Sequence, residues 1–437
     1  MVRRVVITGV GLISPLGNTP EKLWAALESG TSGVRELESV PPGVHSIHHG
    51  AEARDFTGAI EDFGILEKGM ARNIKKNLKV MCREMQIGIA AAQLALTDSK
   101  FALEEKNRDR VGCVCGSEYM MTMPQEFTAG IRSCVDGKRE FDFSDWAEKG
   151  LPAVEPLWLL KYLPNLPASH FAIFNDLRGP NNSLTMREAS SNLAVAEAAM
   201  TISRGHADAM IAGATGTKIH PTRMIHASAQ EEIATADGPP EQLSRPFDRR
   251  RRGSVLGEGA AALMLEEAEH AERRGATIYG EVIGFASSAV AARSGNGYLK
   301  TAFKNVLSRS LVSAGAKTGD VGHVHAHGLS AKACDQAEAQ AIAEVFSDGG
   351  RGVPVVAAKS YFGNLGAASG LVELIASLGA LRNGRLFRTL NYEVPDTECP
   401  VNVVKSGDVP AGDVFVNVNS SPQGQASAVV IRRYGTR

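Results

Sequence analysis

Two segments of the chain place polar side chains where a short strand-like run turns into a helix of small residues. In the first, Thr185-Met186-Arg187-Glu188-Ala189-Ser190-Ser191 leads into a helix predicted over Ala189–Ser203. In the second, an apolar run at Val353–Ala357 and a turn precede a helix predicted over Ala367–Leu381. The first N–H groups of a helix are unpaired and its N-terminus carries partial positive charge, which suits a thiolate or an oxyanion. If a pseudo-twofold axis relates the two units, both N-termini point into one pocket.

Histidine, lysine and asparagine follow the apolar runs of the second half of the chain. His325 and His327 end one such run, and Lys359 and Asn364 follow another. Imidazole and amide groups are suitable donors to an oxygen on which negative charge develops. The alternative for His327 is a core histidine whose hydrogen bonds are satisfied. His325 has the weaker claim to a site.

Strand-like and helix-like segments alternate along the chain, which indicates an α/β protein. Strands are predicted at Val5–Thr8, Arg110–Cys115, Ala209–Gly213, Ala261–Leu265, Val353–Ala357 and Val414–Val418. Further helices are predicted at Cys82–Leu96, Lys300–Ala314 and Ala337–Val345. The Arg/Pro/Gly-rich stretch Arg245–Gly253 is the predicted seam between two halves.

Bulk composition excludes several classes of protein. A net charge of −1 over 437 residues gives no general attraction to nucleic acid or to anionic membranes. No apolar run approaches the roughly 18 residues of a membrane span. The cysteines have neither disulfide-framework density nor CxxC zinc spacing, so we expect reduced cysteines, no metal and a cytoplasmic location; they are Cys82, Cys113, Cys115, Cys134, Cys334 and Cys399.

Several ordered motifs carry a family resemblance from about Arg3 to Arg433. They are Arg4–Gly11 with Ser14-Pro15-Leu16-Gly17, Ala207–Gly213, Ser244-Arg245-Pro246-Phe247-Asp248, Leu256–Ala260, His325-Ala326-His327-Gly328 with Asp335 and Glu338, and Lys359-Ser360 with Gly363 and Gly366–Gly370. Together they resemble the elongating β-ketoacyl-acyl-carrier-protein synthases. The resemblance implies the thiolase fold, with two αβαβα halves in five layers, here divided as residues 1–252 and 253–437.

The same resemblance implies an activity and partners. Such synthases carry out decarboxylative Claisen condensation, usually as dimers, and need no cofactor. Their ligands are phosphopantetheine-linked acyl and malonyl groups on an acyl carrier protein. A basic stretch with Arg72, Lys75 and Lys76 is the expected docking surface for this acidic carrier, and Arg249–Arg252 is a second candidate.

The resemblance also assigns positions in the site. The family's nucleophilic cysteine falls on Glu188, its first catalytic histidine on His327, and its second on Asn364. Lys359 and Glu338 are expected to form a buried ion pair that organises the site. The glycine-rich oxyanion and gate loop reads Ser421-Pro422-Gln423-Gly424, in which proline fixes φ and removes an N–H donor.

These departures leave several functions open. Glu188 can be a first-turn carboxylate that complements the helix dipole, with Arg187 as a candidate partner. Acylation of a carboxylate gives an anhydride, and no motif here protects one. We therefore expect a partner subunit that resembles a chain length factor and pairs with itself or with a cysteine-containing ketosynthase. The alternatives are a malonyl-carrier decarboxylase using His327 and Asn364, and an acyltransferase with Glu188 as general base. A synthase with Ser190 or Ser191 as substitute nucleophile is the least favoured.

Overall fold

The computed structural model describes residues 3–40, 45–135, 137, 139–235, 238–292, 297–347 and 352–436. Its strands are β1 (Val5–Ile13), β2 (Arg35–Glu36), β3 (His49–Gly50), β4 (Val111–Ser117), β5 (Asn181–Thr185), β6 (Ala209–Thr217), β7 (Glu258–Glu267), β8 (Gly280–Ala289), β9 (His323–His325), β10 (Pro354–Val356), β11 (Asn402–Val403), β12 (Val414–Ser420) and β13 (Gln425–Arg432). Its α-helices are α1 (Pro20–Ser29), α2 (Lys68–Asn77), α3 (Arg83–Ser99), α4 (Thr128–Ser133), α5 (Leu166–Asn175), α6 (Ser190–Ser203), α7 (Pro221–Gln230), α8 (Ala268–Arg273), α9 (Leu299–Ala314), α10 (Lys332–Val345), α11 (Lys359–Phe362) and α12 (Ser369–Asn383).

The large sheet contains the same arrangement of strands twice. Within the described residues its order is β11-β10-β9-β12-β13-β8-β1-β7-β6-β4-β5. Reading outward from the centre, β1-β7-β6-β4-β5 matches β8-β13-β12-β9-β10, and the parallel and antiparallel pairings match as well. Within the described part of the large sheet, the two sets of strands pair with each other where Val5–Ile7 lies beside residues 280–282. This repetition is the pseudo-twofold relation that the sequence predicted.

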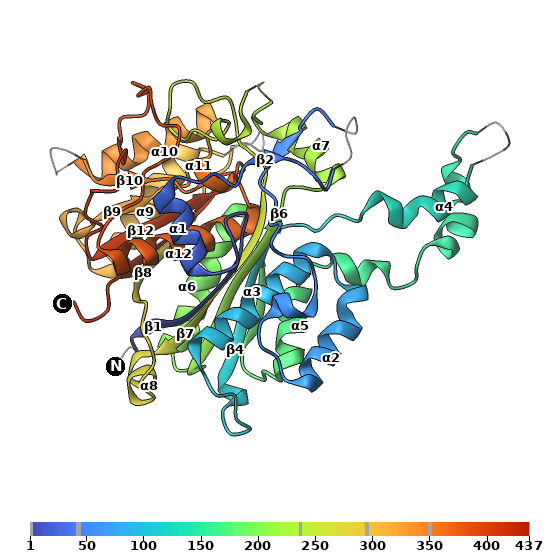
Figure 1. The fold of residues 1–437 in the computed structure, drawn as a ribbon, viewed down its shortest axis with the longest axis horizontal. Coiled ribbons are helices and arrows are strands. Elements are labelled where there is room, and N and C mark those ends of the chain that lie inside the picture. Colours follow the sequence, from blue (N-terminus) through green and yellow to red (C-terminus); the bar gives the residue numbers. More distant parts are fainter. Residues whose placement is uncertain are drawn as a thin grey trace.

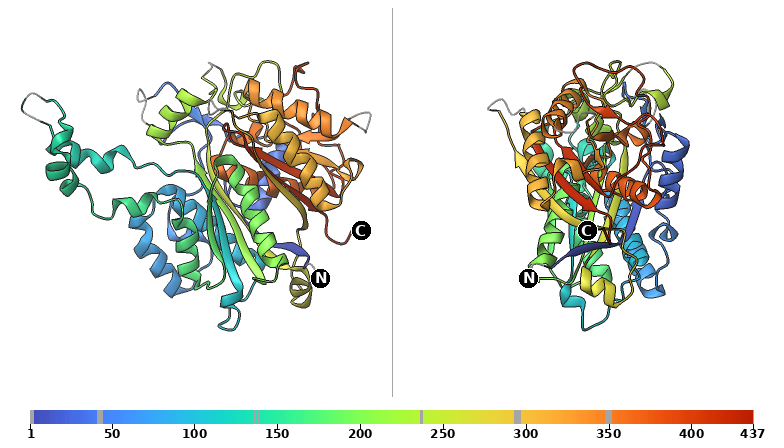
Figure 2. Two further views of the ribbon diagram at one scale, coloured as in Figure 1. Left: turned by 180° about the vertical axis from the view of Figure 1, so that it is seen from behind. Right: turned by 90° about the vertical axis from the view of Figure 1, so that its left-hand side faces the viewer.

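Helices α6 and α12 form the layer between the two half-sheets (Figures 1 and 2). Helix α3 covers the outer face of β1, β7 and β6, and α9 covers β8, β13 and β12. The central helices approach closely because their facing residues are small. A Cβ atom built on Gly370 of α12 would lie 2.9 Å from Cβ of Ser191 on α6. Helices and half-sheets together make five layers, so the predicted thiolase fold is confirmed.

The predicted division after Arg252 stays a prediction, although strand pairing favours a later boundary. β7 lies between β1 and β6 and therefore belongs with the first set of strands. A boundary between α8 and β8 keeps each set complete. Among the described residues, no helix is both long and apolar enough to cross a membrane.

The segment between β4 and α5, which contains α4, includes an arm that projects away from the body of the molecule (Figures 1 and 2). The sequence interpretation did not foresee this arm. Its described part exposes many large apolar side chains, which are Tyr119, Ile131, Val135, Phe141, Phe143, Leu151, Leu157, Leu159 and Leu160. Such a concentration of exposed apolar surface is typical of a protein interface.

Candidate active site

A tight elbow presents Glu188 at the start of the first central helix. β5 ends at Thr185, and a short 3₁₀ turn over Arg187–Ala189 leads directly into α6. Arg187 has a φ of 53°, a left-handed conformation that costs energy for a residue with a side chain. Glu188, next along the chain, is only 1% exposed. The strained backbone at Arg187 thus accompanies the burial of the Glu188 carboxylate.

The second strand–turn–helix unit places the N-terminus of α12 opposite that of α6. A 3₁₀ turn over Gly366–Ala368 leads into α12, and the Ser191 hydroxyl donates a hydrogen bond to the carbonyl oxygen of Ala367. Asn364, just before this turn, donates from Nδ2 to Oε1 of Glu188 over 3.0 Å. The structure therefore brings Glu188 and Asn364 together at the two helix N-termini, as the sequence predicted.

Glu188 is held as a carboxylate. Nζ of Lys218 lies 2.7 Å from its Oε1, and Nε of Arg187 lies 3.6 Å from its Oε2. Burial by itself raises the pKa of a carboxyl, but Lys218, Arg187 and Asn364 outweigh it and hold the pKa of Glu188 well below its ordinary value. A carboxylate with so low a pKa is a poor general base and carries no proton to donate.

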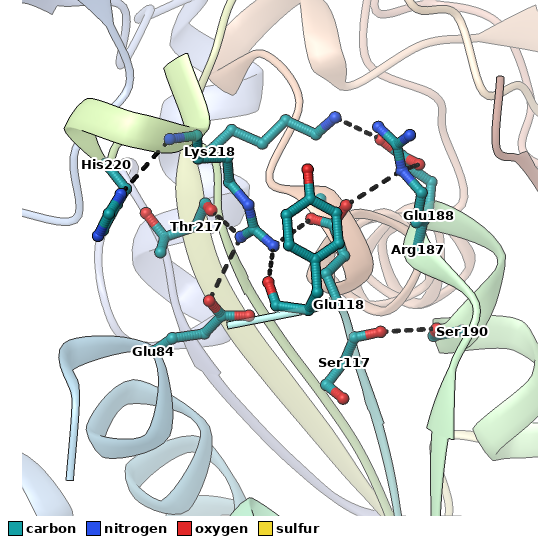
Figure 3. A network of polar contacts seen from close by, with 12 residues as sticks. Glu84, Ser117, Glu118, Arg187, Glu188, Ser190, Thr217, Lys218 and His220 are labelled. Atoms are coloured by element: carbon teal, nitrogen blue, oxygen red, sulfur yellow. Dashed lines mark hydrogen bonds and ion pairs between the residues drawn. The ribbon is translucent and has the colours of Figure 1, made fainter. Parts of the chain in front are cut away.

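The pair between Glu188 and Lys218 belongs to a larger buried ion network (Figure 3). Lys218 also contacts Glu231 at 3.0 Å, and Arg187 contacts Glu231 and, at 3.3 Å, Glu118. The network has four carboxylates and three cations, which are Glu84, Glu118, Glu188 and Glu231 with Lys218, Arg187 and Arg223.

The charges of this network balance at neutral pH. Arg223 reaches Glu84 at 3.4 Å and Glu118 at 3.7 Å. Burial raises the pKa of Glu84 to about 8, so this carboxyl is mostly protonated at pH 7. Three carboxylates then face three cations.

His327 is a neutral imidazole with a defined tautomer. Nζ of Lys359 and Nδ2 of Asn419 both donate to its Nδ1, over 3.2 and 3.3 Å. Neither donor group can accept, so the ring proton lies on Nε2. Burial, assisted by the charge of Lys359, holds the pKa of His327 well below its ordinary value. His327 therefore presents an N–H donor and no charge.

The predicted ion pair between Lys359 and Glu338 is wrong. Lys359 pairs with Glu373 on α12 and also donates to the carbonyl oxygen of His327 over 2.8 Å. Glu338 on α10 accepts the backbone N–H groups of His327 and Gly328, over 2.6 and 2.8 Å. Both residues organise the His327 segment, but through different groups.

The loop Ser421–Gly424 is a tight turn that joins β12 to β13. The Gly424 N–H donates to the Ser421 carbonyl oxygen over 3.1 Å, and Gly297 donates to Pro422 over 3.3 Å. Nη1 of Arg187 donates to Oε1 of Gln423 over 3.2 Å. The turn is thus tied to the Glu188 elbow.

The hydroxyl groups of Ser190 and Ser191, which follow Glu188, are hydrogen-bonded to the surrounding backbone. The Ser190 hydroxyl donates to the Ser117 carbonyl oxygen over 3.1 Å and accepts from the Met186 N–H over 2.8 Å (Figure 3). Ser191 is bonded to Ala367. His325 is likewise a satisfied core residue, which donates from Nδ1 to Ser377 over 2.8 Å and accepts at Nε2 from Ala358.

The two candidate docking stretches differ in exposure. Arg72, Lys75 and Lys76 are exposed on α2, whose Ile74 faces the core. Within Arg249–Arg252, Arg251 is buried and pairs with Asp396 at 2.6 Å, and Arg250 pairs with Asp248 at 3.2 Å. The second stretch is therefore partly structural.

Sequence reasoning missed Lys218, Glu231, Glu118, Arg223, Glu373 and Asn419 as site residues. One signal was available for Lys218, because it directly follows β6, a fully buried strand of mostly small residues. A lysine in that position is only 2% exposed, so it requires a buried carboxylate partner.

Models of known protein families cover most of the chain. The N-terminal domain of β-ketoacyl synthases matches residues 2–271, and the C-terminal domain matches residues 279–393. The chain belongs to the β-ketoacyl synthase family. A Coxiella burnetii protein named 3-oxoacyl-[acyl-carrier-protein] synthase 2 is 33% identical over 409 residues, which are 92% of this chain and 91% of the relative.

Solved structures of the family superpose over the whole chain. A β-ketoacyl synthase from Burkholderia phymatum is 27% identical with a TM-score of 0.83, covering all of both chains. The ishigamide ketosynthase/chain length factor is 25% identical with a TM-score of 0.83, again covering all of both chains. Glu188, Asn364 and Pro422 therefore lie within a β-ketoacyl synthase scaffold.

Proposed function

We propose that this protein is a non-condensing partner subunit of fatty-acid or polyketide synthesis, similar in role to a chain length factor. The observation that carries the proposal is the ion network around Glu188. The position that must attack an acyl thioester holds a carboxylate whose Oε1 contacts Lys218 at 2.7 Å and Asn364 at 3.0 Å. The similarity to a ketosynthase/chain length factor structure is consistent with this role.

Condensation requires a nucleophile that accepts an acyl group and room for that group. Glu188 is ionised and bound by Lys218 and Asn364, with Arg187 3.6 Å away, and acylation would convert it to an anhydride. Separating Glu188 from Lys218 would also break a buried ion pair, which is costly. The turn at Pro422 is tied to Arg187 through Gln423. These features favour a structural function for the site.

We place the contact with the partner at the edge of the sheet and on the arm. In the described part of the large sheet, β5 is an edge strand with exposed residues at Asn181, Asn182 and Thr185, and the arm exposes apolar side chains. Edge strands and exposed apolar segments favour pairing with another chain. Co-expression with a cysteine-containing ketosynthase should therefore give a 1:1 complex by native mass spectrometry. Exclusive homodimers with every candidate synthase would contradict the proposal.

Charges placed on the arm should prevent this assembly. Phe143 and Leu157 are 74% and 53% exposed, so changing both to Asp buries no charge in the free subunit. We expect Phe143→Asp/Leu157→Asp to weaken the complex at least about tenfold, because desolvating a charge in an interface is costly. Ile65→Asp/Val312→Asp is the matched control, since these two side chains outside the arm are 91% and 81% exposed. Equal loss in the control would show that the arm has no special role.

Carrier docking can be tested on α2. Reversing two exposed cations with Lys75→Glu/Lys76→Glu should weaken binding of an acidic acyl carrier protein about tenfold at low salt and less at high salt. Arg309→Glu/Lys317→Glu changes the net charge equally at exposed positions elsewhere. Surface plasmon resonance at two salt concentrations distinguishes the pairs. Equal weakening by both would assign the effect to net charge alone.

One observation favours malonyl-carrier decarboxylation as a second candidate function. The Nε2–H of His327 remains a donor for an enolate oxygen, because its Nδ1 accepts from Lys359 and Asn419. Intact-mass analysis of malonyl-carrier incubated with the protein tests this activity, with His327→Ala as control. If the protein forms acetyl-carrier and the variant does not, the partner-subunit proposal is wrong and decarboxylation takes its place. The low pKa of Glu188 disfavours the acyltransferase alternative.

A further inference from the structure

Helix α1 packs against α12 (Figure 1), and a cavity of about 260 Å³ lies between them. Val10 of β1 and Tyr279, directly before β8, complete its wall. β1 and β8 are the strands through which the two sets of strands pair with each other. The cavity therefore contacts both sets, and none of the roles proposed above uses it.

The cavity is separate from the Glu188 site. Ser369, the first residue of α12, hydrogen-bonds to Asn364 of that site over 3.2 Å. The residues of α12 that line the cavity lie instead in the second half of the helix, between positions 375 and 383. One of them, Gly379, is roughly 15 Å further along the helix axis than Ser369. A small ligand in the cavity would therefore not contact Glu188.

Most of the wall is apolar and includes two aromatic rings. Trp24 of α1 is half-buried and packs on Gly379, where an added Cβ atom would lie 2.9 Å from Cε3 of the indole. Tyr279 is fixed because its hydroxyl donates to Oδ2 of Asp98 over 2.8 Å. The other apolar lining residues are Val10, Pro20, Leu23, Ile375, Ala376 and Leu378. Such a wall favours an aromatic ring, which adds ring contacts to the burial of its apolar surface.

The volume of the cavity suits a ligand with one ring. A cavity of about 150 Å³ is sufficient to hold benzene. The 260 Å³ available here therefore accommodate an aromatic ring together with a short linker, and leave the polar end of the ligand at the opening.

Two opposite charges line the same cavity. Glu21 on α1 and Arg382 on α12 are both exposed. In the part of the chain that the structure describes, neither side chain has an ion pair or a hydrogen bond. Burial and the hydrogen bond to Asp98 raise the pKa of Tyr279, and Arg382 and Glu21 act on this pKa with opposite sign. Both charges therefore lie near the Tyr279 ring and are available to a ligand.

The signs of these charges restrict the head group of the ligand. A ligand with a single charge would be attracted by one of the two side chains and repelled by the other. A free α-amino acid carries a carboxylate that suits Arg382 and an ammonium group that suits Glu21. It is therefore the kind of head group that both charges favour.

We propose that this cavity binds a free aromatic α-amino acid. The aromatic ring would lie against the wall that contains Trp24 and Tyr279, with the carboxylate at Arg382 and the ammonium group at Glu21. Binding would be non-covalent and would not depend on the proposed function as a partner subunit.

The fluorescence of Trp24 reports directly on this binding. The chain contains three tryptophans, and the other two, Trp146 and Trp158, lie between β4 and α5. In the full chain with Trp146→Phe/Trp158→Phe, titration with L-phenylalanine should change the Trp24 emission saturably. Isothermal titration calorimetry of the unsubstituted protein should give the same affinity. Absence of saturable binding in both measurements would overturn the proposal.

Two analogues of L-phenylalanine test the head group. Phenylpropionate lacks the ammonium group and phenylethylamine lacks the carboxylate. Each should bind about threefold to tenfold more weakly than L-phenylalanine, as expected for the loss of one charge-assisted contact that is partly exposed to solvent. Equal affinity for L-phenylalanine and the two analogues would overturn the proposal.

Two variants at exposed positions test the same contacts from the side of the protein. Arg382→Gln should weaken binding of L-phenylalanine by this factor without weakening binding of phenylethylamine. Glu21→Gln should weaken binding of L-phenylalanine without weakening binding of phenylpropionate. Arg309→Gln and Glu61→Gln are the matched controls at exposed positions outside the cavity and should leave the affinity unchanged. Unchanged affinity for L-phenylalanine in both cavity variants would contradict the proposed binding mode.

Discussion

Replacing Lys218 with methionine should lower the free energy of unfolding by about 3–5 kcal/mol, the usual cost of leaving one partner of a buried ion pair alone. Lys218 and Glu188 are 2% and 1% exposed with 2.7 Å between Nζ and Oε1, and Lys218 also contacts Glu231. In this variant the buried carboxylates of Glu188 and Glu231 each lose the ammonium group of Lys218, which both contact in the native protein. Chemical denaturation at pH 7, followed by circular dichroism, measures the loss.

The double variant Lys218→Met/Glu188→Leu is the control for this experiment. Removing both charges leaves no unpaired carboxylate at position 188, so we expect it to recover part of the stability lost in Lys218→Met. Glu231 keeps Arg187 as a partner in both variants. If the single variant is as stable as the native protein, Glu188 is not locked by Lys218, and the main support for the partner-subunit proposal is lost.

Replacing His323 with glutamine should make the protein less sensitive to acid. His323 is fully buried, donates from Nδ1 to the Ala411 carbonyl oxygen over 2.8 Å, and accepts at Nε2 from Ser377 over 3.1 Å. Burial lowers its pKa from 6.5 to about 4. The unfolded chain therefore binds a proton below pH 6.5 that the folded protein does not bind until about pH 4.

This difference in proton binding destabilises the native protein as pH falls from 6.5 to about 4. The loss is about 1.4 kcal/mol for each pH unit between the two pKa values, or roughly 3 kcal/mol in total. Buried carboxyls with raised pKa, such as Glu338, change stability in the opposite direction over part of this range, so the comparison with the variant isolates His323. The stability gap between native protein and His323→Gln should shrink by this amount from pH 6.5 to pH 4. His48→Gln, at an exposed position, is the control for the substitution itself. A constant gap in both variants would refute the assignment.

Much of the scaffold could be predicted because its pattern is local. The predicted helix Ala189–Ser203 matches α6 within one residue, and the strand Val414–Val418 lies within β12. α10 begins at Lys332, five residues before the predicted start at Ala337, because polar residues in its first turn obscure the apolar period. The arm escaped prediction because its short helical turns lack a sustained period, so no apolar face could be assigned to it.

The site was predicted less completely than the fold. Glu188, Asn364 and His327 could be placed from the order of motifs, whereas the partners of Glu188 come from elements far apart in the sequence. Lys218 follows β6 and Glu231 follows α7, and only the packed structure brings them to the elbow. The wrong pairing of Lys359 with Glu338 has the same origin, since Glu373 on α12 resembles any other helical glutamate in sequence.

The sharing of charge around Glu188 also limits how this chain could change over evolutionary time. Placing a cysteine at position 188 in one step would leave Lys218 and Arg187 with one carboxylate fewer. Removing Lys218 first would leave Glu188 without its nearest cation. Either order passes through a protein with an unbalanced interior charge. A thiol at position 188 in a charge-balanced interior would therefore require coordinated substitutions, and not the change of the single codon at position 188 alone.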